Sequence, residues 1–203
     1  MKRQLGILPG TRPAEERRQW GDTLHNQRLE QRAWQRQALH ETSTAFLEGG
    51  PHPQRLSEVL AVRLARLIGG GCIIRRRVEE PGSPPLACAH ARASSLDALQ
   101  RSFDKSPHAL AFACSAQAAD SRQPIVLPRV SSQAMHLWTQ PAGWPYLDAH
   151  QMRSVLVAPV GSSDRVCATI VVWREHPCRP LTDAHRGLLD QVALRIVPAL
   201  MTQ

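Results

Sequence analysis

The chain has 203 residues, 42% of them hydrophobic, which is enough for one domain with a substantial core and an extension. No apolar run approaches the ~20 residues that a membrane-spanning helix needs, and the N-terminus lacks the apolar stretch of a signal peptide, so we expect a cytoplasmic protein. The net charge of +8 attracts polyanions, but acidic residues interleave with the arginines and no motif of the usual nucleic-acid-binding modules is present. Nucleic-acid binding is therefore not expected.

The N-terminal fifth of the chain predicts an extension that precedes the main domain. Residues 1–12 are expected to be disordered, and residues 13–50 read as one long polar helix that stops at Gly49-Gly50-Pro51. A weak apolar seam runs along it through Trp20, Leu24, Gln27, Gln31, Trp34, Ala38 and Ala45. A helix this long cannot bury such a stripe on a small domain alone, so we expect pairing with a second copy in a homodimer. The alternative is a helix that lies partly free or folds back on its own domain.

The remaining residues, 53–203, predict one α+β domain. Apolar residues at helical spacing indicate a helix over 53–68, and later short helices over 94–101 and 107–119. We expect strands over 72–78 and 86–92 to form a hairpin, and a brief strand to cover 123–127. Residues 128–151 are expected to form a long irregular segment. Strands over 153–159 and 165–174 are expected to pair antiparallel, and a helix is expected to begin at Thr182. This order indicates an antiparallel sheet with helices segregated to its faces.

Aromatic and basic residues suggest a ligand pocket beside the segment 128–151. That segment gathers two of the five tryptophans and the single tyrosine of a chain with 4% aromatic residues. In the first strand, alternation places one arginine on the more apolar face, where it needs an anionic ligand or a carboxylate such as Asp148. The alternatives are a plug of core residues and an edge strand with both faces wet. The candidate pocket residues are Arg76, His136, Trp138, Trp144, Tyr146 and His150.

Four segments resemble the GAF domain family of bacterial signalling proteins. They are Leu56 to Ile68, Ala111 to Leu127, Arg153-Ser-Val-Leu-Val-Ala-Pro159, and Leu181-Thr-Asp-Ala-His185 at the start of the last helix. The resemblance covers about Arg55 to Met201 and implies a GAF-like antiparallel sheet flanked by helices. It also implies a sensory or regulatory role, with a cavity between the sheet and short helices in many members.

The chain departs from the specialised members of the family. At the positions where the resemblance places the nucleophilic cysteine and the acidic residue of the free methionine sulfoxide reductases, this chain has Asp148 and Val155. Bilin-binding members attach their chromophore to a cysteine usually followed by histidine; Cys88-Ala-His90 comes nearest, and there we expect a packed thiol and a surface imidazole. The cyclic-nucleotide motif is absent from the sequence. We therefore expect no catalytic residue.

The sequence does not identify a cofactor. Haem-binding members use one histidine as axial ligand, for which His108, His136 and His150 are equivalent candidates. His176, Cys178 and His185 supply only three ligands, where a structural zinc site needs four, so no metal is expected.

These observations predict a non-catalytic GAF-like regulatory domain. It would bind a small ligand or a protein partner and signal as a dimer through its terminal helices, to a kinase or cyclase output domain or to a partner protein. The alternatives are a ligand-free interaction scaffold and a redox enzyme on the same fold.

Overall fold

The structure, a computed structural model, describes residues 14–77, 84–162 and 164–201. The expected disordered segment 1–12 lies outside them. The chain divides into two compact units, residues 1–37 and residues 38–203. Helix α1 (Ala14–Gly49) supplies the described part of the first unit and the first residues of the second. It ends where Gly50 adopts a left-handed φ of 64° ahead of Pro51.

The last turns of α1 pack within the second unit. Ala38 and Ala45, two members of the apolar seam, are buried there. From helix α2 (Pro53–Ile68), Arg63 reaches Glu41 at 2.6 Å and Glu48 at 2.9 Å. These turns fold back on their own domain, so this part of the seam is unavailable to a second subunit.

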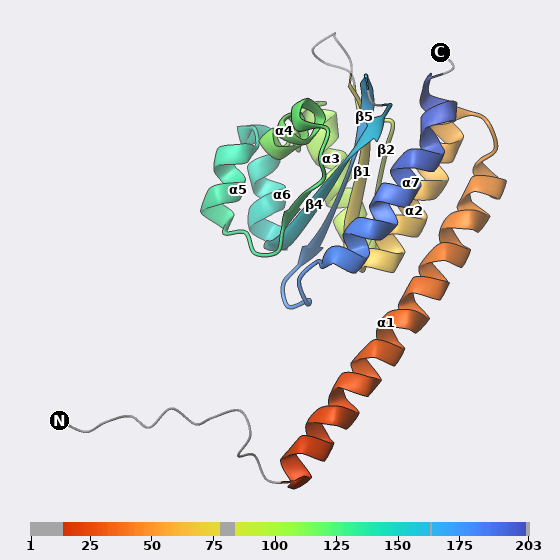
Figure 1. Ribbon diagram of the computed structural model, residues 1–203. Helices are drawn as coiled ribbons and strands as arrows, with labels where there is room; N and C mark the ends of the chain where they lie inside the picture. Colours follow the sequence, from red (N-terminus) through yellow and green to blue (C-terminus); the bar gives the residue numbers. More distant parts are fainter. Residues whose placement is uncertain (1–13, 78–83, 163, 202–203) are drawn as a thin grey trace. The chain divides into compact units, whose positions relative to one another are not determined.

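A five-stranded antiparallel sheet in the order β2-β1-β5-β4-β3 forms the centre of the second unit (Figure 1). Its strands are β1 (Gly71–Arg76), β2 (Ala87–His90), β3 (Ile125–Leu127), β4 (Met152–Gly161) and β5 (Val166–Glu175). The predicted hairpin of β1 with β2 and the predicted pairing of β4 with β5 are confirmed. Both β4 and β5 are almost wholly buried, which fits their near-continuous apolar sequences.

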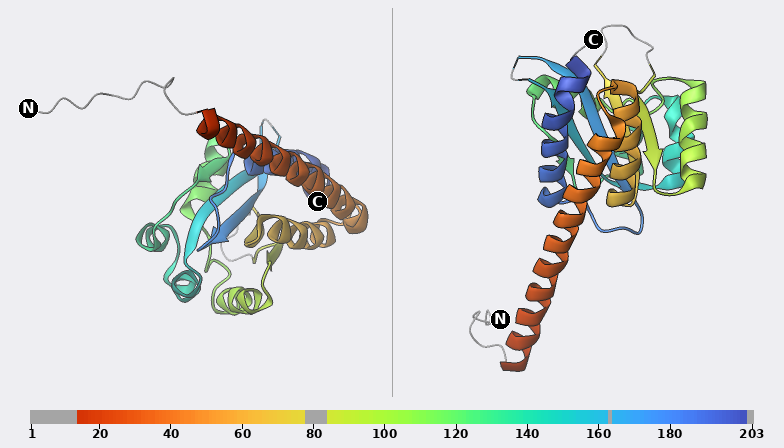
Figure 2. Two further views of the ribbon diagram at one scale, coloured as in Figure 1. Left: turned by 90° about the horizontal axis from the view of Figure 1, so that it is seen from below. Right: turned by 90° about the vertical axis from the view of Figure 1, so that its right-hand side faces the viewer.

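Helices cover both faces of this sheet, and the predicted α+β class is confirmed (Figures 1 and 2). Helix α2 and helix α7 (Asp183–Met201) lie on one face. Helices α3 (Ala93–Lys105), α4 (Ala113–Ser121), α5 (Ser132–Trp138) and α6 (Trp144–His150) lie on the other. Because side chains alternate along a strand, β1 and β5 contribute residues to both layers.

The prediction of an irregular segment over residues 128–151 is wrong. This stretch contains α5, a 3₁₀ turn (Pro141–Gly143) and α6. Pro141 and Pro145 each occupy the first turn of a helix, where a missing N–H costs nothing. The Ser131 hydroxyl accepts a hydrogen bond from the amide of Ala134 at 3.2 Å and so caps the N-terminus of α5.

Candidate functional site

A groove of about 420 Å³ lies between α4 and strands β1 and β5. Its apolar lining includes Ile73, Leu110, Phe112, Ala116, Ala119 and Val171. Thr169 and Arg75 add polar groups to the floor, and Arg76 also contributes to the lining. An apolar concave surface with a few polar groups is the usual form of a small-molecule site.

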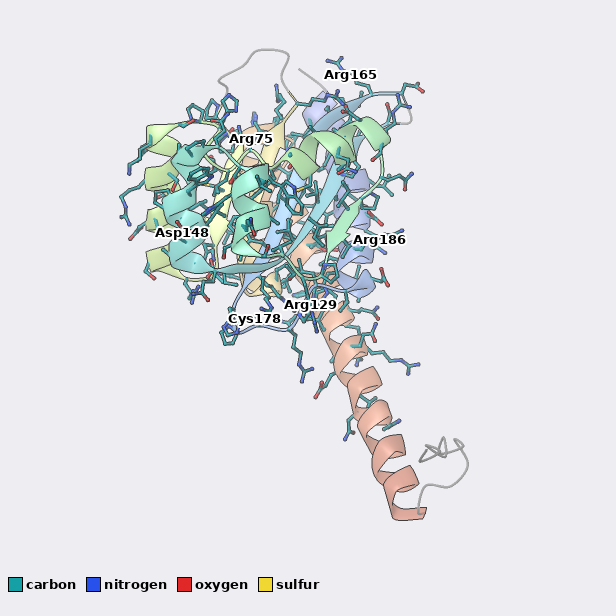
Figure 3. The ribbon with its side chains drawn as sticks, turned by 90° about the vertical axis from the view of Figure 1, so that its left-hand side faces the viewer. Arg75, Arg129, Asp148, Arg165, Cys178 and Arg186 are labelled. Atoms are coloured by element: carbon teal, nitrogen blue, oxygen red, sulfur yellow. The ribbon has the colours of Figure 1, made fainter. Side chains whose placement is uncertain are left out.

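Arg75 is the arginine that β1 places on the face of the groove. Its guanidinium donates to the carbonyl oxygen of Pro107 at 2.7 Å and lies 5.8 Å from the Phe103 ring centre. Burial lowers the pKa of Arg75. Asp148, considered above as a counter-charge, lies on α6 apart from Arg75 (Figure 3) and pairs with His136 instead.

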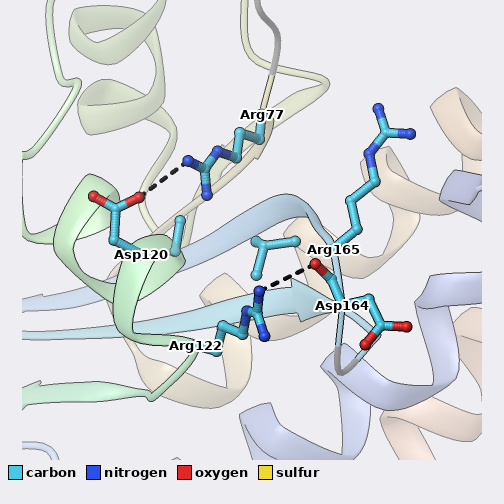
Figure 4. A pocket seen from close by; sticks show the side chains of 7 residues that line it. Arg77, Asp120, Arg122, Asp164 and Arg165 are labelled. Atoms are coloured by element: carbon cyan, nitrogen blue, oxygen red, sulfur yellow. Dashed lines mark hydrogen bonds and ion pairs between the residues drawn. The ribbon is translucent and has the colours of Figure 1, made fainter.

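A second hollow of about 460 Å³, here called the charged hollow, adjoins the groove (Figure 4). It shares Arg77, Ala119 and Asp120 with the groove and adds Arg122, Asp164, Arg165 and Val166. Arg77 pairs with Asp120 at 3.0 Å, and Arg122 donates to the backbone oxygen of Asp164 at 3.1 Å.

A polar cluster around Glu175 lies between the sheet and helices α3 and α6. Glu175 is 3% exposed, and its Oε1 accepts from His90 Nε2 at 2.9 Å and from the Tyr146 hydroxyl at 3.2 Å. Arg92 pairs with the other carboxylate oxygen. His150 Nδ1 lies 3.7 Å from Oε1. Four side chains from two segments, residues 90–92 and helix α6, thus converge on one buried carboxylate.

The hydrogen bonds of His90 define its tautomer. The amide of Arg92 donates to Nδ1 at 3.0 Å, so Nδ1 is unprotonated and Nε2 carries the proton donated to Glu175. Burial, followed by the charge of Arg92, lowers the pKa of His90 to about 4. Burial also lowers the pKa of His150 and raises that of Tyr146, whose hydroxyl therefore remains a donor. The His90 imidazole in this cluster is therefore neutral at pH 7.

A second network joins the end of β5 to both helices of the opposite face. Arg174 Nε donates to the carbonyl of Ile68, at the end of α2, at 2.6 Å. Its Nη2 lies 3.1 Å from Nε2 of His185, in the first turn of α7. The Thr182 amide donates to Nδ1 of His185 at 3.0 Å, and the Thr182 hydroxyl lies 2.8 Å from the same nitrogen. Burial, then the charge of Arg174, lowers the pKa of His185 to about 4.

We expect the stability of the fold to fall on acidification. In the folded state His90 and His185 take up protons only near pH 4, whereas the unfolded chain takes them up near pH 6.5. The contribution of these two histidines to the free energy of unfolding is therefore fully present above pH 6.5. It is lost as the pH falls from 6.5 to 4, at about 1.4 kcal/mol per pH unit for each histidine. Urea unfolding measured from pH 7.5 to 4.5 checks this.

The same titration with His90→Gln tests the assignment, because glutamine can still donate to Glu175 but does not titrate. The slope of stability against pH should become smaller in this variant. An unchanged slope would show that His90 does not contribute to the acid sensitivity.

His136 and Trp144 form a separate pair at the surface of α5 and α6. Their rings stack with centres 4.9 Å apart, and the Trp144 indole donates to the backbone oxygen of His136 at 3.3 Å. His136 Nε2 lies 2.7 Å from the carboxylate of Asp148. Trp138 is half-buried and packs against the core beneath these helices.

The six sequence-predicted pocket residues therefore lie in different places. Arg76 lines the groove, Tyr146 and His150 belong to the Glu175 cluster, and His136, Trp138 and Trp144 lie on α5 and α6. The expectation of a surface imidazole at His90 is wrong, because its side chain is 1% exposed.

Sequence reasoning missed the centre of the cluster and most of the groove. Glu175 lies two residues after Trp173 in a buried strand and so shares its face; this period of two was the available signal. The groove residues Ala116 and Ala119 carry no chemical signal, because small side chains only leave space.

Among the described cysteines, burial raises the pKa of Cys72, Cys88, Cys114 and Cys167, to about 11 for Cys114. These thiols are protonated at neutral pH and are poor nucleophiles. No group of three or more His, Cys, Asp or Glu side chains within residues 14–77, 84–162 and 164–201 is arranged to hold a metal ion.

The domain is an antiparallel sheet between two helical layers, with a groove beside the central strands. The family model described as GAF domain matches residues 52–200. The chain belongs to the GAF domain family, whose fold is typical of sensory and regulatory domains.

Solved structures with this fold come from proteins of different activity. The GAF domain of an Acinetobacter phosphoenolpyruvate-protein phosphotransferase is 13% identical with a TM-score of 0.57, covering 84% of this chain and 92% of that one. Free methionine-R-sulfoxide reductase from Neisseria meningitidis is 12% identical with a TM-score of 0.58, covering 84% and 90%. The GAF domain of a putative sensor histidine kinase from Pseudomonas syringae pv. tomato is 14% identical with a TM-score of 0.51, covering 85% and 90%. At these identities the likeness shows the fold alone.

A search of curated proteins gave no match. Within the described part of the chain, none of the helices combines the length and apolar character needed to span a bilayer.

Proposed function

We propose that the chain is a non-catalytic sensory domain that binds a small, largely apolar molecule in the groove and signals, as a cytoplasmic dimer, through its terminal helices. The observation that carries this proposal is the groove of about 420 Å³ over β1 and β5. Its apolar floor and wall supply most of the binding free energy by excluding water, at about 25 cal/mol per Å² of buried apolar surface.

The strands that form the floor of the groove also contact α2 and α7, the first and last helices of the GAF domain. Val171 lines the groove, while the next residue, Val172, is buried on the opposite face by alternation. At the end of the same strand, Arg174 bonds to the last residue of α2 and to His185 of α7. A ligand that favours one position of β5 would therefore change the packing of both helices by population shift.

Three observations support the absence of catalysis. The buried thiols have raised pKa values, and Asp148 and Val155 stand where the resemblance places the reductase residues. The Glu175 cluster is occupied internally, since its carboxylate accepts from His90, Tyr146 and Arg92. These residues serve structure in the proposal.

A ligand-free scaffold is the second candidate. The side of the sheet beneath α5 and α6 is filled by core residues, including Met135, Tyr146 and Leu147, with Trp138 packed against them. This favours a scaffold role for that region, so ligand binding is assigned to the groove alone.

Filling the groove should abolish ligand uptake. We expect 1-hexanol to give saturable shifts of the Ile73, Leu110 and Val171 methyl resonances, because these side chains line the groove. Ala116→Trp places a large ring at the groove and should weaken binding at least about tenfold, or 1.4 kcal/mol. Titration followed by methyl NMR provides the measurement.

Gln117→Trp is the matched control, since Gln117 is exposed on the same helix and is absent from the groove lining. Its affinity for 1-hexanol should equal that of the wild type. Equal affinity in Ala116→Trp as well, or shifts that never saturate, would rule out the groove as the binding site.

Exposed leucines of α1 and α7 support dimerisation. Leu47 is 85% exposed on α1, and Leu194 is 71% exposed on α7. Leu47→Lys should weaken dimerisation by about tenfold, the effect of withdrawing one buried leucine. Sedimentation velocity across a dilution series measures this. Leu137→Lys, at an 80% exposed position on α5, is the control and should leave the dimer intact. A monomeric wild-type chain at all concentrations would contradict the proposal.

A further inference from the structure

Strand β3 forms one edge of the sheet. It ends the strand order β2-β1-β5-β4-β3, and β4 is its neighbour on the inner side. Within the described residues, no segment other than β4 hydrogen-bonds to the backbone of Ile125, Val126 or Leu127. The outer side of β3 therefore presents backbone groups to which one more strand can be added, a common way of binding an extended segment of a partner.

Two arginines lie opposite each other where this edge ends. The register of β3 with β4 pairs Leu127 with Val155 and, continued past β3, places Arg129 opposite Arg153. The amide of Val130 donates to the carbonyl oxygen of Arg153 at 2.9 Å, so the two segments are still adjacent there. Both arginine side chains are exposed, and neither makes an ion pair or hydrogen bond with another described side chain. Like charges directly opposite on neighbouring segments of a sheet are destabilising, unless a carboxylate binds between them.

Two further arginines lie on the adjoining segments. Arg174 of β5 pairs in register with the residue after Arg153, and its Nη1 donates to the carbonyl oxygen of Arg179 at 3.0 Å. Arg179 is exposed in the loop between β5 and α7. Figure 3 shows Arg129 at the same end of the sheet as Cys178, the residue before Arg179. These backbone contacts place four arginines at one end of the sheet.

Carboxylates do not balance these four charges. In the segments that carry the arginines, residues 127–130, 152–155 and 174–183, the acidic residues are Glu175 and Asp183. Glu175 is buried, and Arg92 pairs with its carboxylate. Four arginines against Asp183 leave an excess of three positive charges. A partner with several carboxylates complements this surface.

We propose that the outer edge of β3 and these arginines bind an extended, acidic segment of a partner protein. The strand edge favours a polypeptide over a nucleic acid, because a polypeptide supplies backbone donors and acceptors at strand spacing. The arginines favour acidic side chains, since guanidinium groups form charge-assisted hydrogen bonds with carboxylates. Side chains at every second position of a strand share a face, so glutamates with this spacing can meet arginines in succession.

The test measures the affinity of the intact chain for a fluorescent octapeptide of alternating glutamate and threonine by fluorescence anisotropy. Arg129→Gln and Arg153→Gln should each weaken binding about tenfold, the effect of losing one charge-assisted hydrogen bond. Arg101→Gln is the matched control, because Arg101 is exposed on α3, which packs on β2 at the opposite edge of the sheet. It changes the net charge equally and should keep the wild-type affinity. An equal loss in this control would overturn the inference, because binding would then follow net charge alone.

Unfolding measurements separate lost binding from lost structure. Arg129→Gln and Arg153→Gln should each raise the urea midpoint of unfolding, because each removes the repulsion between the two guanidinium groups. Weaker binding by a more stable variant does not come from loss of fold. A lower midpoint in both variants would contradict the cross-strand repulsion on which the inference rests.

Two further probes test the class of the partner. A copy of the octapeptide that is N-methylated at every residue keeps the charge but has no backbone donor, and it should bind at least about tenfold more weakly. Equal affinity of the two peptides would overturn strand addition. An oligothymidylate that binds as tightly as the octapeptide, with the same dependence on Arg153, would overturn a protein partner in favour of nucleic acid. These probes do not report on the groove, so their failure leaves the proposed function unchanged.

Discussion

Glu175→Ala is expected to lower the free energy of unfolding by about 3 kcal/mol, the cost of breaking a buried charged pair. The substitution removes the acceptor of His90 Nε2–H and of the Tyr146 hydroxyl, both of which are buried. Each donor would then be desolvated without a partner, and the cavity left by the side chain adds to the loss. Urea unfolding at pH 7.5 provides the measurement.

The His136–Asp148 pair offers a matched control for this result. Its nitrogen–oxygen distance of 2.7 Å resembles the 2.9 Å of His90 and Glu175, but the Asp148 side chain is 58% exposed. Asp148→Ala should therefore cost less than about 1 kcal/mol. Equal losses in the two variants would show that burial does not set the strength of the Glu175 cluster.

Gly71→Ala is expected to destabilise the fold by about 3 kcal/mol, at the upper end of the range for overpacking a core. A Cβ at this position would overlap the Trp173 ring, which is fully buried. The ring cannot move aside freely, because it also contacts Phe112, Tyr146 and His90 at ring-centre distances between 6.2 and 6.4 Å. Thermal and urea unfolding should both show the loss.

Gly187→Ala supplies the opposite case. Gly187 lies inside α7, and a Cβ there would meet nothing within 4 Å. Alanine should stabilise the helix by about 0.5 to 1 kcal/mol through its lower conformational entropy in the unfolded chain. If Gly71→Ala were as well tolerated as Gly187→Ala, the close approach of β1 to Trp173 would be refuted.

The architecture was accessible from sequence where periodicity was strong. Helix α2 shows apolar residues at helical spacing from Leu56 to Ile68, and β4 and β5 are long apolar runs around a polar turn. The family resemblance rested on these segments, and the family model matches residues 52–200. Local pattern and tertiary burial agree in this part of the chain.

The candidate site was less accessible, because it depends on which side chains converge. The aromatic residues of 128–151 suggested one pocket, but Tyr146 turns to Glu175 whereas Trp144 stacks on His136 at the surface. The groove depends on small residues of α4, and the charged hollow on Arg77, Arg122 and Arg165, which are far apart in sequence. Periodicity along one segment cannot predict which side chains from distant segments lie together in the fold.

Hydrogen exchange of the full chain with and without saturating 1-hexanol tests the central claim, that groove occupancy is transmitted to the terminal helices. We predict slower exchange at the groove and also in α2 and α7, and we predict that Arg174→Gln, which cuts the bonds from β5 to Ile68 and His185, restricts the change to the groove. Protection confined to α4, β1 and β5 in the wild type would contradict signalling through the terminal helices.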